Sequence, residues 1–131
     1  MHALSIRQPW AWAILHAHKD IENRDWSTHY RGPFYIHAAR SMSHTEYDDF
    51  VETYLRCIRA TRPNLPLPPK REDLQFGGIV GKAEIVDCVR THSSPWFEGK
   101  YGFVLSGVKP VPFRSLRGSL GFFRVDPEVL K

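Results

Sequence analysis

The sequence has few cysteines and no long hydrophobic run. Its two cysteines, Cys57 and Cys88, lack the spacing of metal ligands and are too few for a disulfide scaffold, so we expect buried free thiols. No apolar run approaches the ~18–20 residues that a membrane span needs, and the N-terminus has no signal-peptide pattern. We therefore expect a soluble, cytoplasmic protein without a membrane partner.

Motifs for metals and nucleotide cofactors are also missing. The seven histidines show no HxxxH or HExxH spacing, and there is no P-loop, GxGxxG motif or nucleophile elbow. His16 and His18 lie at a helix end, about 200° apart around the axis, so they cannot share one ion in a regular helix. We expect no metal site and no cofactor.

The sequence does contain enough apolar residues for a core, and a modest positive charge. Its 131 residues, 42% hydrophobic, fit one domain over residues 1–131. The net charge of +4 modestly favours an anionic partner. The basic residues gather in two groups, each either a phosphate-contacting surface or a solvated face: Arg56, Arg59, Arg62, Lys70 and Arg71 in the middle, and Arg114, Arg117 and Arg124 near the end.

Hydrophobic periodicity predicts an α+β fold. Short, mostly antiparallel strands with two main helices favour a sheet that curls towards a small barrel. Ser43 and Glu46 form a capping box at the start of the clearest helix. Gly81 marks a bulge or a close backbone approach within a strand. The expected strands are residues 3–9, 33–39, 79–89, 103–105 and 118–126, and a proline-bearing edge segment follows residues 103–105, up to residue 113. The expected helices are residues 9–19 and 43–60, and residues 62–76 form a proline-rich surface loop.

The segment HKDIENRDW, residues 18–26, concentrates ionisable groups directly after an apolar helix. On an extended segment, Glu22 and Arg24 point to one face, and Lys19 at the helix junction is free to join them. Two interpretations stay open. The three side chains either form ion pairs that only brace the fold, or converge on a polar ligand.

This segment resembles the motif of a known family. The stretches SIRQPWAWAIL (5–15), KDIENRDW (19–26) and RGPFYIHAA (31–39) resemble the ASCH domain, a branch of the PUA-like superfamily. The family motif G-x-K-x-x-E-x-R reads here Ala17-His18-Lys19-Asp20-Ile21-Glu22-Asn23-Arg24, so only the glycine differs. Alanine resists the positive φ that glycine adopts, which puts the local turn in question.

The resemblance continues along most of the chain. GGIVGKAEIVDCV (77–89), KYGFVLS (100–106) and RGSLGFFRV (117–125) look like the later strands of the family. The resemblance implies a PUA-like small β-barrel with a cleft, and RNA or a modified nucleoside as the partner. Family members have been linked to RNA binding, transcription coactivation, ribonuclease activity and, in one branch, hydrolysis of acetylated cytidine.

The catalytic candidates are Lys19, Glu22 and Arg24. An amidohydrolase would use Lys19 as amine or base, Glu22 to orient it, and Arg24 to hold an oxyanion or the substrate. A metal-independent ribonuclease would pair a base with cations around the phosphate, from the same three residues. The hydrolytic branch carries threonine in place of Glu22, and a carboxylate cannot act as that neutral hydroxyl.

Aromatic and polar side chains supply the other candidates. A base stacked on an aromatic face gains ~1–3 kcal/mol, so tryptophan beside cations suits unstacked nucleotides, although simple packing explains a tryptophan equally well. Ser5 and Gln8 either contact a base edge or cap the backbone. Glu84 is either exposed or a second cleft carboxylate. The candidate nucleic-acid-binding residues are Ser5, Gln8, Trp10, Trp26, Arg31, Glu84 and Trp96.

Three functions follow from these observations. The first is an RNA-binding module whose cleft recognises single-stranded RNA or a modified nucleotide, and it is the one that we favour. The second is a hydrolase that uses the same cleft. The third is a protein-interaction module with the proline loop as its contact surface. The sequence leaves the oligomeric state undecided.

Overall fold

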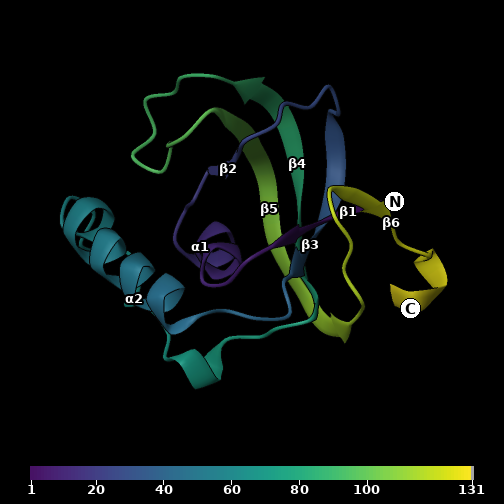
Figure 1. The fold of residues 1–131 in the computed structure, drawn as a ribbon, viewed down its shortest axis with the longest axis horizontal. Coiled ribbons are helices and arrows are strands. Elements are labelled where there is room, and N and C mark those ends of the chain that lie inside the picture. Colours follow the sequence, from purple (N-terminus) through teal and green to yellow (C-terminus); the bar gives the residue numbers. More distant parts are fainter. Residues whose placement is uncertain (131) are drawn as a thin grey trace.

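A computed structural model describes residues 1–130 and confirms the α+β fold. Six strands form one curled sheet in the order β2-β5-β4-β3-β1-β6, antiparallel except for β1 beside β3. The sheet curves around α1, and α2 lies beyond α1 on the side away from the sheet (Figure 1). The strands are β1 (His2–Ile6), β2 (Ile21–Arg24), β3 (Gly32–Ala38), β4 (Gly78–Val89), β5 (Tyr101–Ser115) and β6 (Phe122–Arg124), and the helices are α1 (Trp10–His16) and α2 (His44–Thr53).

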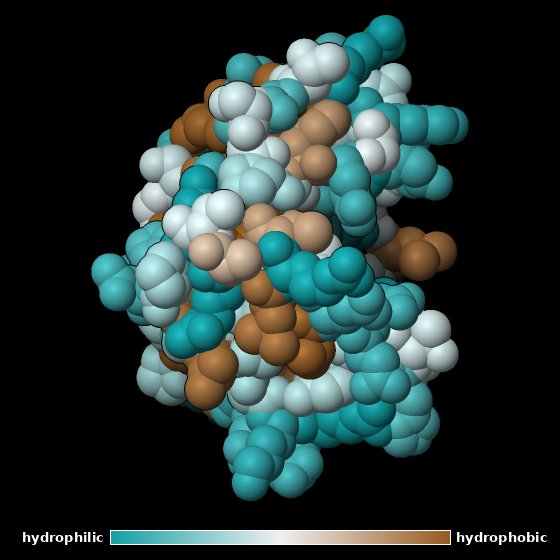
Figure 2. Space-filling model, turned by 90° about the vertical axis from the view of Figure 1, so that its left-hand side faces the viewer, coloured by the Kyte–Doolittle hydropathy of each residue, from teal (hydrophilic) through white to brown (hydrophobic). Residues whose placement is uncertain are grey.

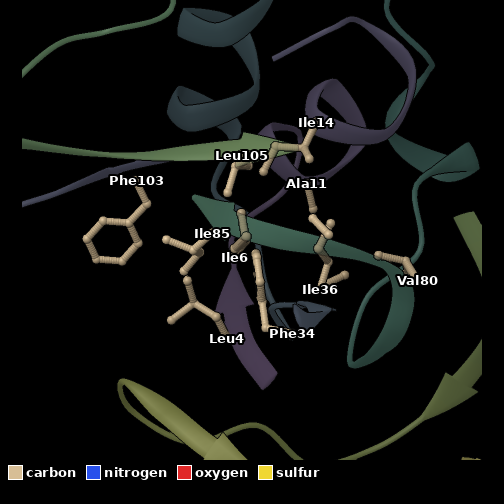
Figure 3. Packing of buried hydrophobic residues seen from close by; sticks show 12 residues of the cluster. Leu4, Ile6, Ala11, Ile14, Phe34, Ile36, Val80, Ile85, Phe103 and Leu105 are labelled. Atoms are coloured by element: carbon tan, nitrogen blue, oxygen red, sulfur yellow. The ribbon is translucent and has the colours of Figure 1, made fainter. Parts of the chain in front are cut away.

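The short helix α1 joins two hydrophobic clusters. Ala11 and Ile14 point into the concave side of the sheet (Figure 3). Ala13 and Ala17, on the opposite side of the helix, pack against α2. The sheet-side partners are Leu4, Ile6, Phe34, Ile36, Ala38, Val80, Ala83, Ile85, Phe103 and Leu105. Because apolar contacts on both sides hold α1 in place, the position at which the following segment leaves the helix is also fixed.

Gly81 explains how α1 approaches the sheet so closely. A Cβ at this position would lie 2.4 Å from Leu15 Cδ2 of α1 and 2.9 Å from the Lys109 carbonyl oxygen. The pairing of β4 with β5 also shifts register between Ile79 and Gly81. Both roles expected of this glycine, close approach and bulge, are therefore present.

The helix α2 begins as the sequence predicts. The Ser43 hydroxyl accepts from the Glu46 backbone N–H at 3.0 Å, and the Glu46 carboxylate accepts from the Ser43 N–H at 2.8 Å. The helical path then continues as a π-helix over Tyr54–Arg59. Two tyrosine hydroxyls tie the proline-rich loop to this helix, Tyr47 to the Pro69 carbonyl at 2.7 Å and Tyr54 to the Pro66 carbonyl at 2.6 Å.

Some local expectations are wrong. Cys57 is exposed and Cys88 half-buried, because Cys57 lies on the solvent side of the π-helix. The strand β5 extends to Ser115, through Pro110 and Pro112, so the expected strand at residues 103–105 and the proline-bearing edge segment after it form one continuous strand. The strand β2 pairs with β5 only up to Val104, so the later part of β5 is an edge, where a missing proline N–H does no harm.

The surface over α2 is mainly polar. Figure 2 shows this face as largely hydrophilic, with apolar side chains in separate patches. Among the described residues, Leu55 and Leu67 are large exposed apolar side chains, 39% and 65% accessible. No helix in the described part of the chain is long and apolar enough to cross a membrane.

Candidate nucleic-acid-binding cleft

The three charged residues of the motif meet in one buried network. The Lys19 Nζ lies 3.0 Å from Glu22 Oε1, and the Arg24 Nη2 lies 3.0 Å from Glu22 Oε2. Lys19 Nζ also donates to the Ile21 carbonyl oxygen. The side chains of Lys19, Glu22 and Arg24 are only 1%, 9% and 21% exposed. The three side chains therefore meet in one buried ion-pair network, which is common to both interpretations of this segment.

The turn between α1 and β2 brings Lys19 to this network. The backbone N–H groups of Ala17 and Lys19 both donate to the Ala13 carbonyl, at 2.9 and 3.1 Å. His18 adopts the positive φ of 56°, whereas Ala17 has a φ of −125°. Histidine is among the residues that tolerate the left-handed region best. The missing family glycine therefore causes no strain, because the turn places its left-handed residue one position later.

Arg24 lies where the two edges of the curled sheet approach each other. The outermost strands are β2 and β6, which are not hydrogen-bonded neighbours. Arg24 Nη2 donates to the Ser5 carbonyl of β1 at 2.8 Å. The Trp26 ring, just after β2, contacts the rings of Phe103 and Phe122 at 5.2 and 5.8 Å between centroids. Side-chain contacts, not backbone pairing, therefore close the barrel between β2 and the β1–β6 edge. We call this place the seam, and Arg24 of the family motif lies at it.

A cleft of about 400 Å³ opens beside the network. Trp10 and Trp26 are half-buried and line it together with the backbone at Ser5 and Ile6. A side pocket of about 520 Å³ adjoins it, and Trp10, Lys19, Asn23, Glu46 and Glu98 contribute to both. The two hollows therefore form a continuous space between the end of the sheet and α2.

A second ion pair lies at the rim of the cleft. The Arg7 guanidinium donates to both Glu46 oxygens, at 2.5 and 2.6 Å, and joins the end of β1 to the start of α2. The hydrogen bond from Arg7 is the main reason why the pKa of Glu46 falls from 4.5 to about 2. The two side chains are 49% and 28% exposed, so water reaches this pair far more than the inner network.

The cleft has more carboxylates than free cations. Its three cations, Arg7, Lys19 and Arg24, are each paired with Glu22 or Glu46. Asp25 and Glu98 also line it, and within residues 1–130 neither carboxylate has a cationic partner. Nor does any group of three or more His, Cys, Asp or Glu side chains in that range gather as metal ligands. The cleft electrostatics thus disfavour a phosphate group.

Other candidate residues divide into those at the cleft and those elsewhere. Trp96 lines the side pocket, but it is 92% buried and stacks on Tyr54 at 5.9 Å between centroids. Gln8 is also buried and bonds the Trp12 N–H and the Gln75 carbonyl, so it caps backbone instead of facing the cleft. Arg31 pairs with Asp87 at 3.7 Å on the surface.

Glu84 is exposed on β4 and lines neither hollow, so the expectation of a second cleft carboxylate from this strand is wrong. Its alternating neighbours Ala83 and Ile85 occupy the core, which turns Glu84 outward. The proline-rich loop is likewise absent from the lining of both hollows.

One residue that the sequence analysis missed organises the cleft. The Asn23 side chain donates to the Trp96 carbonyl at 2.8 Å and accepts from the Glu98 N–H at 3.1 Å. These bonds hold the loop between β4 and β5 against β2. Strand alternation was the available signal for this role. It places the Asn23 side chain on the face opposite to Glu22 and Arg24, where it meets the loop between β4 and β5.

A curled sheet around a short helix, with a polar cleft at the seam, defines the PUA-like class of α+β proteins. The chain belongs to the ASCH domain family, whose model matches residues 4–112. It is 32% identical over 87 residues to the activating signal cointegrator 1 of Homo sapiens, and 31% identical over 87 residues to that of Mus musculus. Each match covers 66% of this chain and 14% of the relative, so the chain spans a small part of the length of these relatives.

Proposed function

We propose that this ASCH domain binds single-stranded RNA and takes one base, standard or modified, into the cleft. The observation that carries the proposal is the convergence of Lys19, Glu22 and Arg24 in a buried network beside a cleft walled by tryptophans. Membership of the ASCH family supports a nucleic-acid ligand.

A base fits this chemistry better than a phosphate does. Bases stack on aromatic side chains, and Trp10 and Trp26 offer such surfaces. The ring and exocyclic N–H groups of a base are donors, and Asp25 and Glu98 are acceptors without a cationic partner in residues 1–130. A phosphate would instead meet these carboxylates without a free cation to offset them.

The hydrolase interpretation has weaker support. An amine or base at Lys19 should be directed at a substrate, but two of the three donor positions of its ammonium point to Glu22 and the Ile21 carbonyl. Glu22 itself is shared with Arg24. This arrangement suits a fixed binding surface more than a proton-transfer group, so we propose binding without turnover.

Fluorescence anisotropy of a labelled single-stranded RNA decamer tests the proposal. We expect Trp26→Leu to weaken binding about 5- to 150-fold, because a stacked base contributes ~1–3 kcal/mol. Trp12→Leu is the matched control, since Trp12 is half-buried but lines neither hollow. Thermal unfolding checks both variants, and Trp10→Leu serves as a second cleft variant if Trp26→Leu unfolds.

The same samples separate binding from hydrolysis. Binding alone returns the RNA intact, and it releases no acetate from acetylcytidine. RNA affinity that is equal in the Trp26, Trp10 and Trp12 variants would contradict a base in the cleft. Cleavage or acetate release that is lost in Lys19→Ala, with the fold retained, would favour the hydrolase instead.

A further inference from the structure

Another hollow, separate from the cleft and its side pocket, lies on the other face of β1. Leu4 and Ile6 point into the core, so the side chain of Ser5 between them faces the opposite side of the sheet. There the ends of β1 and β3 meet the segment that joins β5 to β6, around a hollow of about 780 Å³. We call this hollow the basic groove, and its polar lining residues are Ser5, His37, Arg40, Ser115, Arg117 and Ser119.

The charge of the basic groove is opposite to that of the cleft. Arg40 and Arg117 are both exposed, and neither side chain has an ion pair or hydrogen bond within residues 1–130. No carboxylate among residues 1–130 lines the groove. Exposed guanidinium groups without a protein partner, next to serine hydroxyls, are the donors that phosphate oxygens accept from.

The half-buried Ser5 and the buried His37 form the floor of the groove. His37 is 2% exposed, and its Nε2 lies 2.6 Å from the Leu116 carbonyl oxygen. Because a carbonyl only accepts, Nε2 carries a proton, and Nδ1 lies within hydrogen-bond distance of the Ser5 hydroxyl at 3.0 Å. The Leu116 N–H donates in turn to the Gly77 carbonyl at 3.0 Å. Leu116 is thus fixed at both its N–H and its carbonyl.

The residues after Leu116 are held against this floor. A Cβ on Gly118 would lie 2.7 Å from His37 Cε1 and 3.3 Å from the Ser5 hydroxyl, so only glycine allows such close contact. Arg117 lies between these two anchored positions, and its backbone is therefore fixed before any ligand arrives. An arginine on a fixed backbone loses less backbone entropy on binding than one on a free loop.

The basic groove and the cleft meet at one residue. Ser5 contributes to the lining of both, with its side chain towards the groove and its carbonyl bonded to Arg24 of the cleft network. The groove and the cleft therefore border the same residue of β1, one on each face of the strand. We propose that the basic groove binds the phosphates of the RNA whose base the cleft holds, through Arg40 and Arg117. This inference rests on the proposed function above.

The salt dependence of RNA binding tests the inference. Log affinity falls with log salt, and each phosphate contact to a single strand steepens that fall by about 0.7. The double variant Arg40→Gln with Arg117→Gln should therefore make the slope shallower by about 1.4. We expect roughly tenfold or more loss of affinity for the labelled RNA decamer at 50 mM salt. The matched control is Arg56→Gln with Arg90→Gln, which removes the same charge from exposed positions outside both the cleft and the groove.

The outcomes separate the two proposals. A shallower slope in the groove variant, an unchanged slope in the control, and loss of affinity at constant slope in Trp26→Leu support the inference. Wild-type binding that needs Trp26 but is unchanged by the groove variant overturns the inference and leaves the proposed function intact. Absence of RNA binding by the wild-type chain at 50 mM salt overturns both.

Discussion

The cleft contains two ion-pair groups that look alike by distance and differ in burial. The inner network joins Lys19, Glu22 and Arg24 at 3.0 Å, and the rim pair joins Arg7 and Glu46 at 2.5 Å. The inner lysine side chain is 1% exposed, whereas the rim arginine is 49% exposed. By distance alone, the rim pair would rank as the stronger.

Burial reverses that ranking, since water screens the rim pair and cannot replace a partner lost from the inner network. An exposed ion pair contributes about 0–1 kcal/mol, while removal of one partner from a buried pair costs about 3–5 kcal/mol. The comparison teaches that the inner network is fixed support for the cleft. The rim pair is free to open without unfolding the protein.

The largest expected effect comes from Glu22→Gln. This change leaves the Lys19 ammonium buried without a carboxylate, and we expect a loss of about 3 kcal/mol or more in the free energy of unfolding. Urea unfolding at pH 7 measures it. The control is Glu98→Gln, an exposed cleft carboxylate that should change stability by less than about 0.5 kcal/mol. Equal losses in the two variants would remove the distinction between buried and exposed groups.

The inner network was predictable because its information is local. Lys19, Glu22 and Arg24 lie within six residues, so strand alternation and a helix junction suffice to place them together. The sequence did not reveal that Arg24 bonds the Ser5 carbonyl across the seam, because that contact depends on how the sheet curls. The α+β class and the start of α2 followed from periodicity and a capping box.

The basic groove was not predictable in the same way. Arg117 was part of a C-terminal basic group, but Arg40 and the Ser5–His37 pair come from separate segments that only the parallel β1–β3 pairing brings together. In the middle basic group, Arg56 pairs with Glu52 and Arg71 with Asp48, so two of its five cations have a carboxylate partner. Net charge indicated an anionic partner without locating it.

A smaller effect is expected at the rim, and it depends on pH. The pKa of Glu46 is about 2 in the folded protein against an ordinary value of 4.5, so the ionised carboxylate stabilises the fold above pH 4.5 and this contribution disappears as the pH falls towards 2. Because both side chains are partly exposed, we expect about 1 kcal/mol between wild type and Glu46→Gln at pH 6, and no difference near pH 2. Glutamine retains one acceptor oxygen for the capping box, but it removes the charge and the second oxygen that accepts from Arg7.

Urea unfolding across that pH range measures the rim contribution. A difference that persists undiminished at pH 2 would mean that Glu46 stabilises the protein through its second acceptor oxygen or its packing instead of its charge. A difference that grows on acidification would contradict the sign of the pKa shift, because a depressed carboxyl pKa always favours the folded state at higher pH.

The smallest effect separates the two groups by salt. Raising ionic strength from 0.05 to 1 M shortens the screening length from about 14 Å to about 3 Å, which weakens interactions between charges that water reaches. The stability lost in Glu46→Gln should therefore shrink by a few tenths of a kcal/mol at high salt, while the loss in Glu22→Gln should stay constant because solvent ions do not enter the buried network. The readout is the difference between the two losses at each salt concentration, so any general effect of salt on unfolding cancels. If both losses shrink together, ions reach Lys19, and the inner network is open to solvent in a way that its 1% exposure does not indicate.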